Sequence, residues 1–434
     1  MKRLRMALLV VWIAFLAACG SSGATEEEQG GWSADIERLR EHVIQWHPRF
    51  ANDSLNQRED NTRIRREFEV SLDRLLLDLG YLSDFEIKAE IQRSIALLED
   101  NHFFFTGFSG YFSQMRLLRY PLIFGYFSDG FYLYRAAEEF SDALNLRLVA
   151  LNGIDVQHVF EDFSRFWSVE NVYDARYQFA ALLNAPMVLQ ALGISTEEGV
   201  RFTFEGGTEI LVTQYHQWER LLTTLRWLPT IPLTDARAEG DLPLFRRNLR
   251  QNLWHEFVPE YGILYISIRG WVTDVNGVFG ESVRNTFREN HVQAVIIDAR
   301  GNPGGDANQF NGLFTNFARN LPEGRLFYFV NEGSNSGSLG AAYFLEDLGA
   351  VILGQPLAQN SEFYWFGSGE SQLFLDYSGL EITPPPTSWS SQIFHGRQPS
   401  DGIFRPHVLI EYTIYHWINN NDPFFDFVVE EISK

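Results

Sequence analysis

The chain has 434 residues, of which 35 are basic and 56 are acidic, so its formal net charge is −21. Because 45% of the residues are hydrophobic, the chain can build a large globular protein of two or three domains, which excludes the disordered and fibrous classes. The excess of acid would repel phosphate backbones, so we expect no nucleic acid partner. A single cysteine, Cys19, excludes an intramolecular disulfide and any metal site built from cysteines.

The N-terminal segment resembles the signal of a bacterial lipoprotein. The basic start M-K-R-L-R is followed by an apolar run and then by Cys19 in the sequence L-A-A-C. We predict a signal peptide at 1–18, a lipid on Cys19 and a flexible tether at 19–31. These features predict a cell-envelope protein, periplasmic or surface-exposed, that is anchored to a membrane by its lipid. The alternative is an ordinary secretory signal with an incidental cysteine.

Residues 32–118 show the period of amphipathic helices and predict an N-terminal helical lobe. Residues 119–252 are richer in aromatic and β-branched side chains and predict a β-rich middle domain, with a polar connector from 229. Within it, L-V-A-L-N-G-I-D-V at 148–156 predicts a strand that meets an Asn-Gly turn. The predicted helical faces consist of Leu72, Leu75, Leu76 and Leu79, and of Ile91, Ile95 and Leu98.

Residues 253–434 alternate apolar strands with helical patterns, which indicates βαβ units and a largely parallel sheet. In such sheets the ligand site lies beyond the carboxyl ends of the strands. The segments to inspect are therefore those after Ile297 and after Val330. The predicted strands are 263–268, 294–297, 326–330 and 351–353, and the predicted helices are about 275–289, 306–319 and 337–348.

The segment after Ile297 is glycine-rich, with the sequence D-A-R-G-N-P-G-G at 298–305. Its glycines allow positive φ angles and bring backbone N–H groups close to an anion or oxyanion. A turn that merely fits tight packing is the alternative. No Gly-Lys-Ser/Thr follows, so a phosphate-binding loop is disfavoured.

The segment after Val330 has the sequence N-E-G-S-N-S-G-S and leads into a helix. A serine at the head of a helix has N–H groups and the helix dipole beside the group that it would attack. An N-cap and turn without catalytic role is the alternative. The glycine spacing is not that of the nucleophile elbow of α/β-hydrolases.

Together these segments resemble the tail-specific or C-terminal processing peptidases of family S41, which have a crotonase-like fold. Further matches are A-V-I-L-G-Q-P at 350–356, D-Y-S-G-L at 376–380, N-D-P at 421–423 and, more distantly, L-L-E-D-N-H at 97–102. The run at 148–154 is similar to a strand and turn of a PDZ-like domain. The resemblance implies an α/β fold: a crotonase/ClpP-like βαβ core at 253–434, a PDZ-like or β-rich middle domain and the helical lobe.

The resemblance places the nucleophile on Ser336, with an oxyanion hole made by the N–H of Gly337 and that of Gly304 or Gly305. Two positions depart from the family pattern. Leu339 stands where many members have glutamate, and Asn360 stands where the lysine-dependent branch has its general base.

Histidine is the natural general base, because Lys88 and Lys434 are the only lysines after the predicted signal peptide. An imidazole that titrates near neutral pH can take the serine proton and return it to the leaving amine. His102 stands at the family-like position; a helix-terminal histidine without catalytic role is the alternative. The acid that orients it is left open among Asp100, Glu362 and Glu381.

We therefore expect a serine-type peptidase that cleaves extended polypeptides through an acyl-enzyme on Ser336. No H-E-x-x-H motif is present, and no metal or organic cofactor is implied. The main alternative is a non-catalytic, peptide-binding surface lipoprotein of the same fold. An ester or lactam hydrolase that uses the same pair of residues is a third reading, because a fold and a nucleophile do not fix the acyl group.

Overall fold

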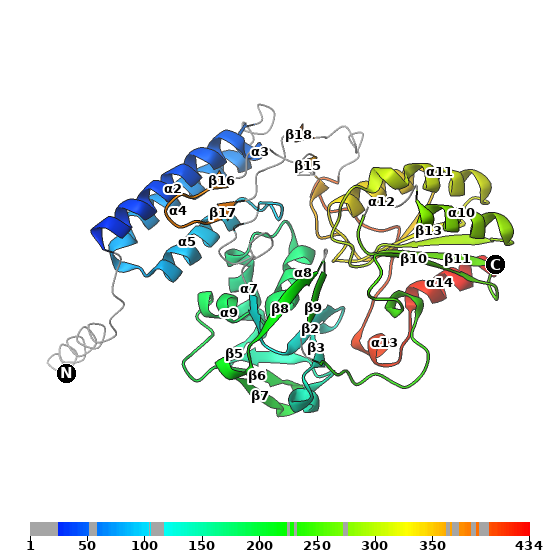
Figure 1. The fold of residues 1–434 in the computed structure, drawn as a ribbon, viewed down its shortest axis with the longest axis horizontal. Coiled ribbons are helices and arrows are strands. Elements are labelled where there is room, and N and C mark those ends of the chain that lie inside the picture. The colour runs from blue at the N-terminus through cyan, green and yellow to red at the C-terminus, as the bar shows by residue number, and fades with distance from the viewer. Residues whose placement is uncertain are drawn as a thin grey trace. The chain divides into compact units, whose positions relative to one another are not determined.

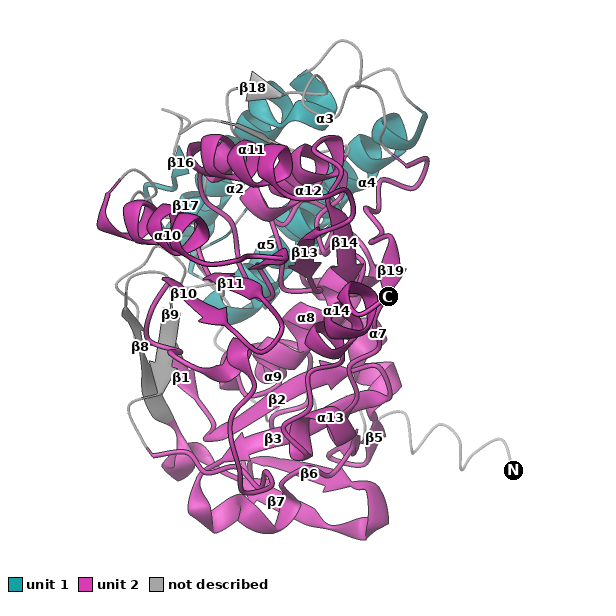
Figure 2. Ribbon diagram, turned by 90° about the vertical axis from the view of Figure 1, so that its right-hand side faces the viewer, with its two compact units in different colours: residues 1–98, 102–111, 369–385 teal, residues 99–101, 112–368, 386–434 magenta. Residues whose placement is uncertain are grey.

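A computed structural model describes residues 25–51, 59–103, 105, 117–223, 226–229, 232–271, 277–361, 365–366, 373–382, 388–389 and 399–434. The chain divides into two compact units, which Figure 2 colours separately. Unit 1 consists of residues 1–98, 102–111 and 369–385. Unit 2 consists of residues 99–101, 112–368 and 386–434.

The N-terminal part of unit 1, residues 25–98, is helical where it is described. Leu72, Leu75 and Leu79 are buried on one face, and Ile91, Ile95 and Leu98 are buried on the next. Apolar side chains at this spacing lie on one side of a helix, which explains why the pattern predicted the lobe. Its elements are α2 (Glu26–Trp46), α3 (Pro48–Ala51), α4 (Glu59–Asp78), η1 (Leu79–Tyr81), α5 (Asp84–Ala96), β16 (Leu373–Phe374) and β17 (Glu381–Ile382).

Helix α2 begins earlier than predicted. Thr25 and Glu28 form a capping box, in which each side chain accepts the backbone N–H of the other residue. Three glutamates in the first turn also interact favourably with the positive end of the helix dipole and so stabilise the start of the helix. Residues 26–31 of the predicted tether are therefore helical.

The segment 369–385, which we predicted as part of the C-terminal core, belongs to unit 1. The carboxylate of Asp35 on α2 accepts the backbone N–H groups of Tyr377 (3.1 Å) and Ser378 (2.8 Å). Gly31 faces the ring of Tyr377 so closely that a Cβ there would lie 2.2 Å from a ring carbon. These contacts tie a late hairpin to the first helix of the lobe.

The first half of unit 2 is rich in strands, as predicted for the middle domain, although no boundary between compact units falls at residue 252. Its sheets have the orders β1-β8-β9, β2-β3 and β5-β4-β6-β7. The strands are β1 (Leu117–Arg119), β2 (Leu122–Phe127), β3 (Gly130–Ala136), β4 (Leu148–Leu151), β5 (Ile154–Asp155), β6 (Val200–Phe204), β7 (Glu209–Val212), β8 (Trp218–Thr223) and β9 (Arg226–Pro229). The helices are η2 (Glu138–Ala143), α7 (Val156–Phe166), α8 (Val172–Leu182), α9 (Pro186–Ala191), η3 (Glu205–Gly207), η4 (Gln214–His216) and η5 (Leu244–Arg246).

The predicted Asn-Gly turn joins β4 to β5. Asn152 and Gly153 both have positive φ, 46° and 79°. Two successive positive φ values are what a tight hairpin turn requires, and Asn-Gly adopts them at low cost. Residues 232–252, within the predicted polar connector, contain the short helix η5 and otherwise neither helix nor strand.

The second half of unit 2 is the predicted βαβ core. Its sheet has the order β10-β11-β12-β13-β14-β19 among the described strands; β10 is antiparallel to β11 and the other pairs are parallel. The strands are β10 (Leu253–Val258), β11 (Ile263–Ile268), β12 (Ala294–Asp298), β13 (Leu326–Val330), β14 (Val351–Gly354) and β19 (Val408–Leu409), with a separate pair β15 (Trp365–Phe366) and β18 (Ser388–Trp389). The helices are α10 (Val278–Glu289), η6 (Ala307–Phe310), α11 (Asn311–Asn320), α12 (Gly337–Asp347), α13 (Ile414–Ile418) and α14 (Pro423–Ile432).

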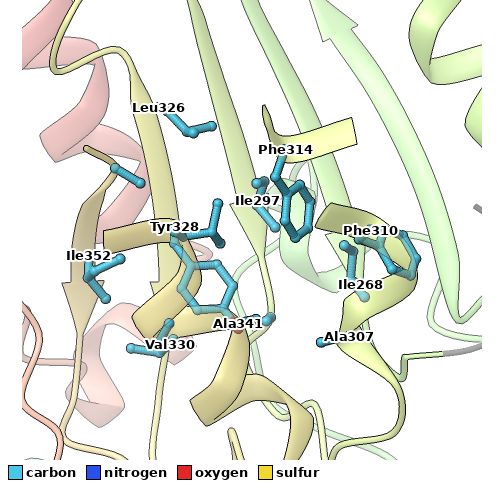
Figure 3. Packing of buried hydrophobic residues seen from close by; sticks show 14 of the residues in the cluster. Ile268, Ile297, Ala307, Phe310, Phe314, Leu326, Tyr328, Val330, Ala341 and Ile352 are labelled. Carbon is cyan, nitrogen blue, oxygen red and sulfur yellow. The ribbon is translucent and has the colours of Figure 1, made fainter. Parts of the chain in front are cut away.

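Both faces of this sheet are covered, by α10, α11 and α12 on one side and by α14 on the other (Figure 1). Tyr328 on β13 points to the first face, where Figure 3 shows it among side chains such as Ile297 and Ala341. Phe327 and Phe329 point to the second face and meet Phe424 of α14. Burial on both faces explains why these strands read as unbroken apolar runs in the sequence.

The register of the parallel strands brings the predicted segments together. Ser267 of β11 pairs with Asp298 of β12, and Asp298 pairs with Phe329 of β13. The loops that follow β11, β12 and β13 therefore leave the same edge of the sheet.

Candidate active site

Asn302 connects the loops that leave the three strands, and it is fully buried. Its side-chain amide donates to the carbonyl of Ile268 and accepts the N–H of Gly304, both at 2.9 Å. Its own carbonyl accepts the N–H of Asn335 (2.9 Å) and the hydroxyl of Ser338 (3.2 Å). One buried residue thus fixes the ends of β11 and β12 against the segment that begins α12.

Asn331 and Ser334 make a second set of links between the same loops. The Asn331 Oδ1 accepts the N–H groups of Gly301 (2.7 Å) and Gly333 (3.1 Å). The Ser334 hydroxyl donates to the carbonyl of Ala299 at 2.8 Å. The two glycine-containing loops therefore form one hydrogen-bonded body.

Ser336 stands at the head of α12, immediately before Gly337, and is half-buried. Its φ is 50° and its ψ is −115°, a backbone conformation that residues other than glycine rarely adopt. A Cβ on Gly304 would lie 2.5 Å from the Ser336 Cβ and 3.0 Å from its Oγ. The serine hydroxyl therefore lies directly against the glycine-rich loop, as the sequence predicted. Backbone strain of this kind is frequent at functional sites.

Two backbone N–H groups beside Ser336 have no acceptor among the described residues: those of Gly337 and Gly305. The next three N–H groups of α12 donate to backbone carbonyls, and the N–H of Gly304 is bound to a side-chain oxygen. A Cβ on Gly337 would lie 2.1 Å from the Gly305 carbonyl, so the two glycines are in contact. Of the two alternatives from the sequence, Gly305 is the one whose N–H can act as the second donor.

Trp271 packs against this arrangement of glycines. Its indole N–H donates to the Ser338 hydroxyl at 3.0 Å. A Cβ on Gly305 would lie 2.4 Å from the Trp271 carbonyl oxygen, and one on Gly337 would lie 2.9 Å from its ring. The backbone of Trp271 packs against Gly305 and its ring packs against Gly337, which leaves room for no side chain at either position.

Arg300 anchors the glycine-rich loop to the C-terminal arm. Its buried guanidinium forms ion pairs with Asp298 and with Asp422, and Asp298 also accepts the hydroxyl of Tyr265 at 2.5 Å. Burial acts to lower the pKa of Arg300, but the two carboxylates outweigh it and hold that pKa well above its ordinary value. Burial together with Asp298 raises the pKa of Tyr265 well above its ordinary value.

The two departures from the family pattern have structural counterparts. Leu339 is fully buried in the apolar cluster between the sheet and α12, so this position is part of the core. The N–H of Asn360 donates to the carboxylate of Glu170 at 2.5 Å, and a Cβ on Gly402 would lie 1.8 Å from its Oδ1. Neither a leucine nor an asparagine side chain can act as a general base.

His102 belongs to unit 1 and Ser336 to unit 2, so their pairing stays a prediction. Among the candidate acids, Asp100 is buried in unit 2, where its carbonyl accepts the Ser168 hydroxyl at 2.8 Å. Glu381 lies on β17 in unit 1. Cys19 and Glu362 lie outside the described residues.

The sequence analysis missed the positioning residues of the site. They lie in or next to the inspected segments but looked like ordinary core or turn residues. The one available signal was the density of asparagines and serines in two loops predicted to meet, since such side chains bind the backbone of neighbouring turns. The missed residues are Trp271, Asn302, Asn331, Ser334 and Ser338.

The described residues also line a shallow cavity of about 610 Å³ on α10 and α11. None of the predicted site residues lines it. Its lining residues are Glu281, Arg284, Asn285, Phe287, Arg288, Asn316 and Asn320.

No protein-family model and no curated protein matches the chain. Among solved structures the chain is similar to a candidate peptidase from Parabacteroides merdae, with a TM-score of 0.44 and 10% identity over 93% of this chain and 97% of that one. It is also similar to the photosystem II D1 C-terminal processing protease, with a TM-score of 0.39 and 13% identity over 89% and 94%. A candidate S41 protease from Bacteroides fragilis is similar with a TM-score of 0.30 and 11% identity, over 74% of this chain and 86% of that one.

Two of these proteins are named as a processing protease or an S41 protease, the kind of protein that the sequence motifs resemble.

Proposed function

We propose that the protein is a serine-type peptidase with a crotonase-like core, in which Ser336 forms an acyl-enzyme. The observation that carries the proposal is the contact between Ser336 and the glycine-rich loop, with two unengaged N–H groups, those of Gly337 and Gly305, beside it. A serine so placed can attack a carbonyl carbon while the developing oxyanion accepts both N–H groups.

In this proposal the Ser336 Oγ adds to the scissile carbonyl and gives its proton to His102. The protonated imidazole then gives the proton to the amine nitrogen as the C–N bond breaks, which leaves an ester on Ser336. In the second half His102 takes a proton from water, whose oxygen adds to the ester carbonyl, and the proton passes to the Ser336 Oγ as the C–O bond to it breaks. The assignment of His102 is supported by its sequence position and by the scarcity of lysine. The substrate is a polypeptide in extended form, which we propose pairs its backbone with a sheet edge of the β-rich, PDZ-like region.

A fluorophosphonate probe tests the nucleophile, because it reacts with activated serines only. We expect labelling of the wild type and none of Ser336→Ala. Ser433→Ala is the matched control, since the Ser433 hydroxyl donates to the carbonyl of Val429 at an exposed helix end. Absence of labelling of the wild type at every pH from 6 to 9 would favour the non-catalytic, peptide-binding alternative.

The general base is tested by the same probe. His102→Gln should slow labelling by orders of magnitude, whereas His291→Gln, at an exposed loop position before β12, should leave it unchanged. Labelling of His102→Gln at the wild-type rate would remove His102 from the mechanism without removing Ser336.

We further propose that a lipid on Cys19 anchors the protein in the cell envelope. Among the described residues, no helix is both long and apolar enough to cross a membrane. Cys19→Ser should abolish incorporation of labelled fatty acid and shift the protein from the membrane to the soluble fraction. Retention of the label in that variant would contradict the anchor.

A further inference from the structure

Helix α8 packs directly against the loop that carries Ser336. A Cβ on Gly333 would lie 2.8 Å from the ring of Tyr177 on α8 and 3.0 Å from the Cα of Gly301. Gly333 is therefore enclosed between α8 and the glycine-rich loop. A group bound at this part of α8 would therefore lie near the loop that carries Ser336.

Arg176, the neighbour of Tyr177, presents a guanidinium without an acidic partner. Its Cζ lies 4.8 Å from the ring centroid of Tyr126 and 5.7 Å from that of Tyr173. Within the described parts of the chain no carboxylate lies within 4.0 Å of its nitrogens, and no hydrogen bond engages them. The tyrosine rings hold the guanidinium in place through cation–π contacts and leave its N–H donors available.

Some arginines of unit 2 bind a carboxylate, and others, such as Arg246 and Arg269, donate to backbone carbonyls instead. Arg237 forms two hydrogen bonds with the carboxylate of Asp235, and Arg405 does the same with Asp401. The chain has a net charge of −21, so acidic partners are abundant. An arginine that lacks one, beside a proposed active site, is available for an anion from outside the chain.

Glu332, on the same loop as Ser336, does not neutralise Arg176. Only 7% of its surface is exposed, and it forms no ion pair or hydrogen bond with the described residues. Burial raises the pKa of Glu332 to about 8, against the opposing effect of Arg176. Glu332 therefore holds its proton more tightly than an ordinary glutamate, which weakens its attraction for the guanidinium of Arg176.

We propose that Arg176, set between Tyr126 and Tyr173, forms a substrate subsite that binds a carboxylate of the polypeptide. The planar fork of a guanidinium matches the two oxygens of a carboxylate. The carboxylate comes either from an acidic side chain near the scissile bond or from the free C-terminus of the substrate. This inference rests on the proposed peptidase function and specifies its substrate class.

The test compares matched peptides with the wild type and with Arg176→Gln. One peptide set exchanges Glu for Gln at each position near the cleavage site, and a second exchanges a free C-terminus for an amide. We expect the wild type to favour the carboxylate form about 10- to 100-fold in kcat/KM, mostly through KM. Arg176→Gln should abolish that preference while cleaving the neutral peptides at the wild-type kcat.

Two further variants complete the design. Arg176→Lys keeps the positive charge but not the planar pair of N–H donors, so it should retain part of the preference for the carboxylate peptide. Arg165→Gln, which removes an exposed arginine paired with Asp162 on α7, should retain all of it. An unchanged rate of fluorophosphonate labelling shows that each variant is folded.

The outcomes separate the two proposals. If the wild type is neither labelled nor active, the peptidase function fails. If the wild type is labelled and cleaves peptides without a carboxylate preference, or if Arg176→Gln retains that preference, the subsite is wrong and the peptidase stands. An effect in the first peptide set alone identifies an acidic side chain as the source, and an effect in the second alone identifies the C-terminus.

Discussion

The guanidinium of Arg300 donates two hydrogen bonds, of 2.8 and 2.9 Å, to the carboxylate of Asp422, which lies 122 positions further along the chain. Both side chains are almost completely buried, with 7% and 5% of their surfaces exposed. The pair joins the glycine-rich loop to the start of α14, where Asp422 also caps the helix. The match of N-D-P at 421–423 to the S41 pattern thus coincides with a contact that holds the site loop.

Removal of one partner from this buried pair should be costly. Asp422→Asn leaves Arg300 with one carboxylate fewer, and we expect a loss of about 3–5 kcal/mol in the free energy of unfolding. Urea denaturation measures it. Arg405→Gln, which breaks an ion pair whose side chains are about half exposed, is the control and should cost about 1 kcal/mol or less. Equal losses in the two variants would contradict the structural role of Asp422.

A methyl group on Gly304 should block Ser336, the proposed nucleophile. Gly304→Ala places a Cβ 2.5 Å from that of Ser336 and also strains a φ of 121°. We expect fluorophosphonate labelling to fall by about 10² or more, since reaction depends on correct placement of the attacking atom. Gly349→Ala separates the two effects, because its φ is 79° but nothing lies within 4 Å of the new Cβ. That control should lose some stability and no labelling.

Ser338 should behave as a positioning residue. Ser338→Ala leaves the indole N–H of Trp271 without its acceptor and removes a bond to Asn302. An unsatisfied buried donor costs about 1–3 kcal/mol, so the melting temperature should fall. We also expect kcat to fall with KM unchanged, because Ser338 does not reach the substrate. A purely structural role would lower stability and leave kcat as it is.

Glu332 should make the stability of the protein fall between mildly acidic and basic pH. The pKa of its carboxyl is raised by burial to about 8, so the folded state holds the proton more tightly than the unfolded state. This contribution is complete below the ordinary pKa near 4.5 and is lost as the pH rises through about 8. Glu332→Gln should therefore unfold at higher urea concentration than the wild type at pH 8.5, and with little difference at pH 4.5.

The exposed Glu289 on α10 provides the control for that experiment. Glu289→Gln should shift the urea midpoint equally at both pH values, and by little. A pH-independent shift in Glu332→Gln as well would show that its carboxyl is ionised across the whole range.

The sequence predicted the core and the place of Ser336 because both follow from short-range patterns. The run at Leu326–Val330 is apolar on both faces, which only a strand buried on both sides requires, and the turn at Asn152 and Gly153 is fixed by two adjacent residues. The two loops could be brought together from the order of strands alone.

What could not be predicted depends on contacts between distant residues. Nothing near Trp271 in the sequence shows that its indole meets a hydroxyl 67 positions away. The attachment of 369–385 to unit 1 rests on Asp35, more than 300 positions earlier. The choice between Gly304 and Gly305 needed the hydrogen bond that engages the first of them.

The positive φ of Ser336 sets activity against robustness at a single position. Alanine there would remove the proposed nucleophile and keep the unfavourable torsion. Glycine would also remove the hydroxyl but would release the torsion, for a gain in stability on the order of 1 kcal/mol. A Ser336→Gly protein with a melting temperature above that of the wild type would measure how much stability the natural sequence loses by keeping a serine at this position.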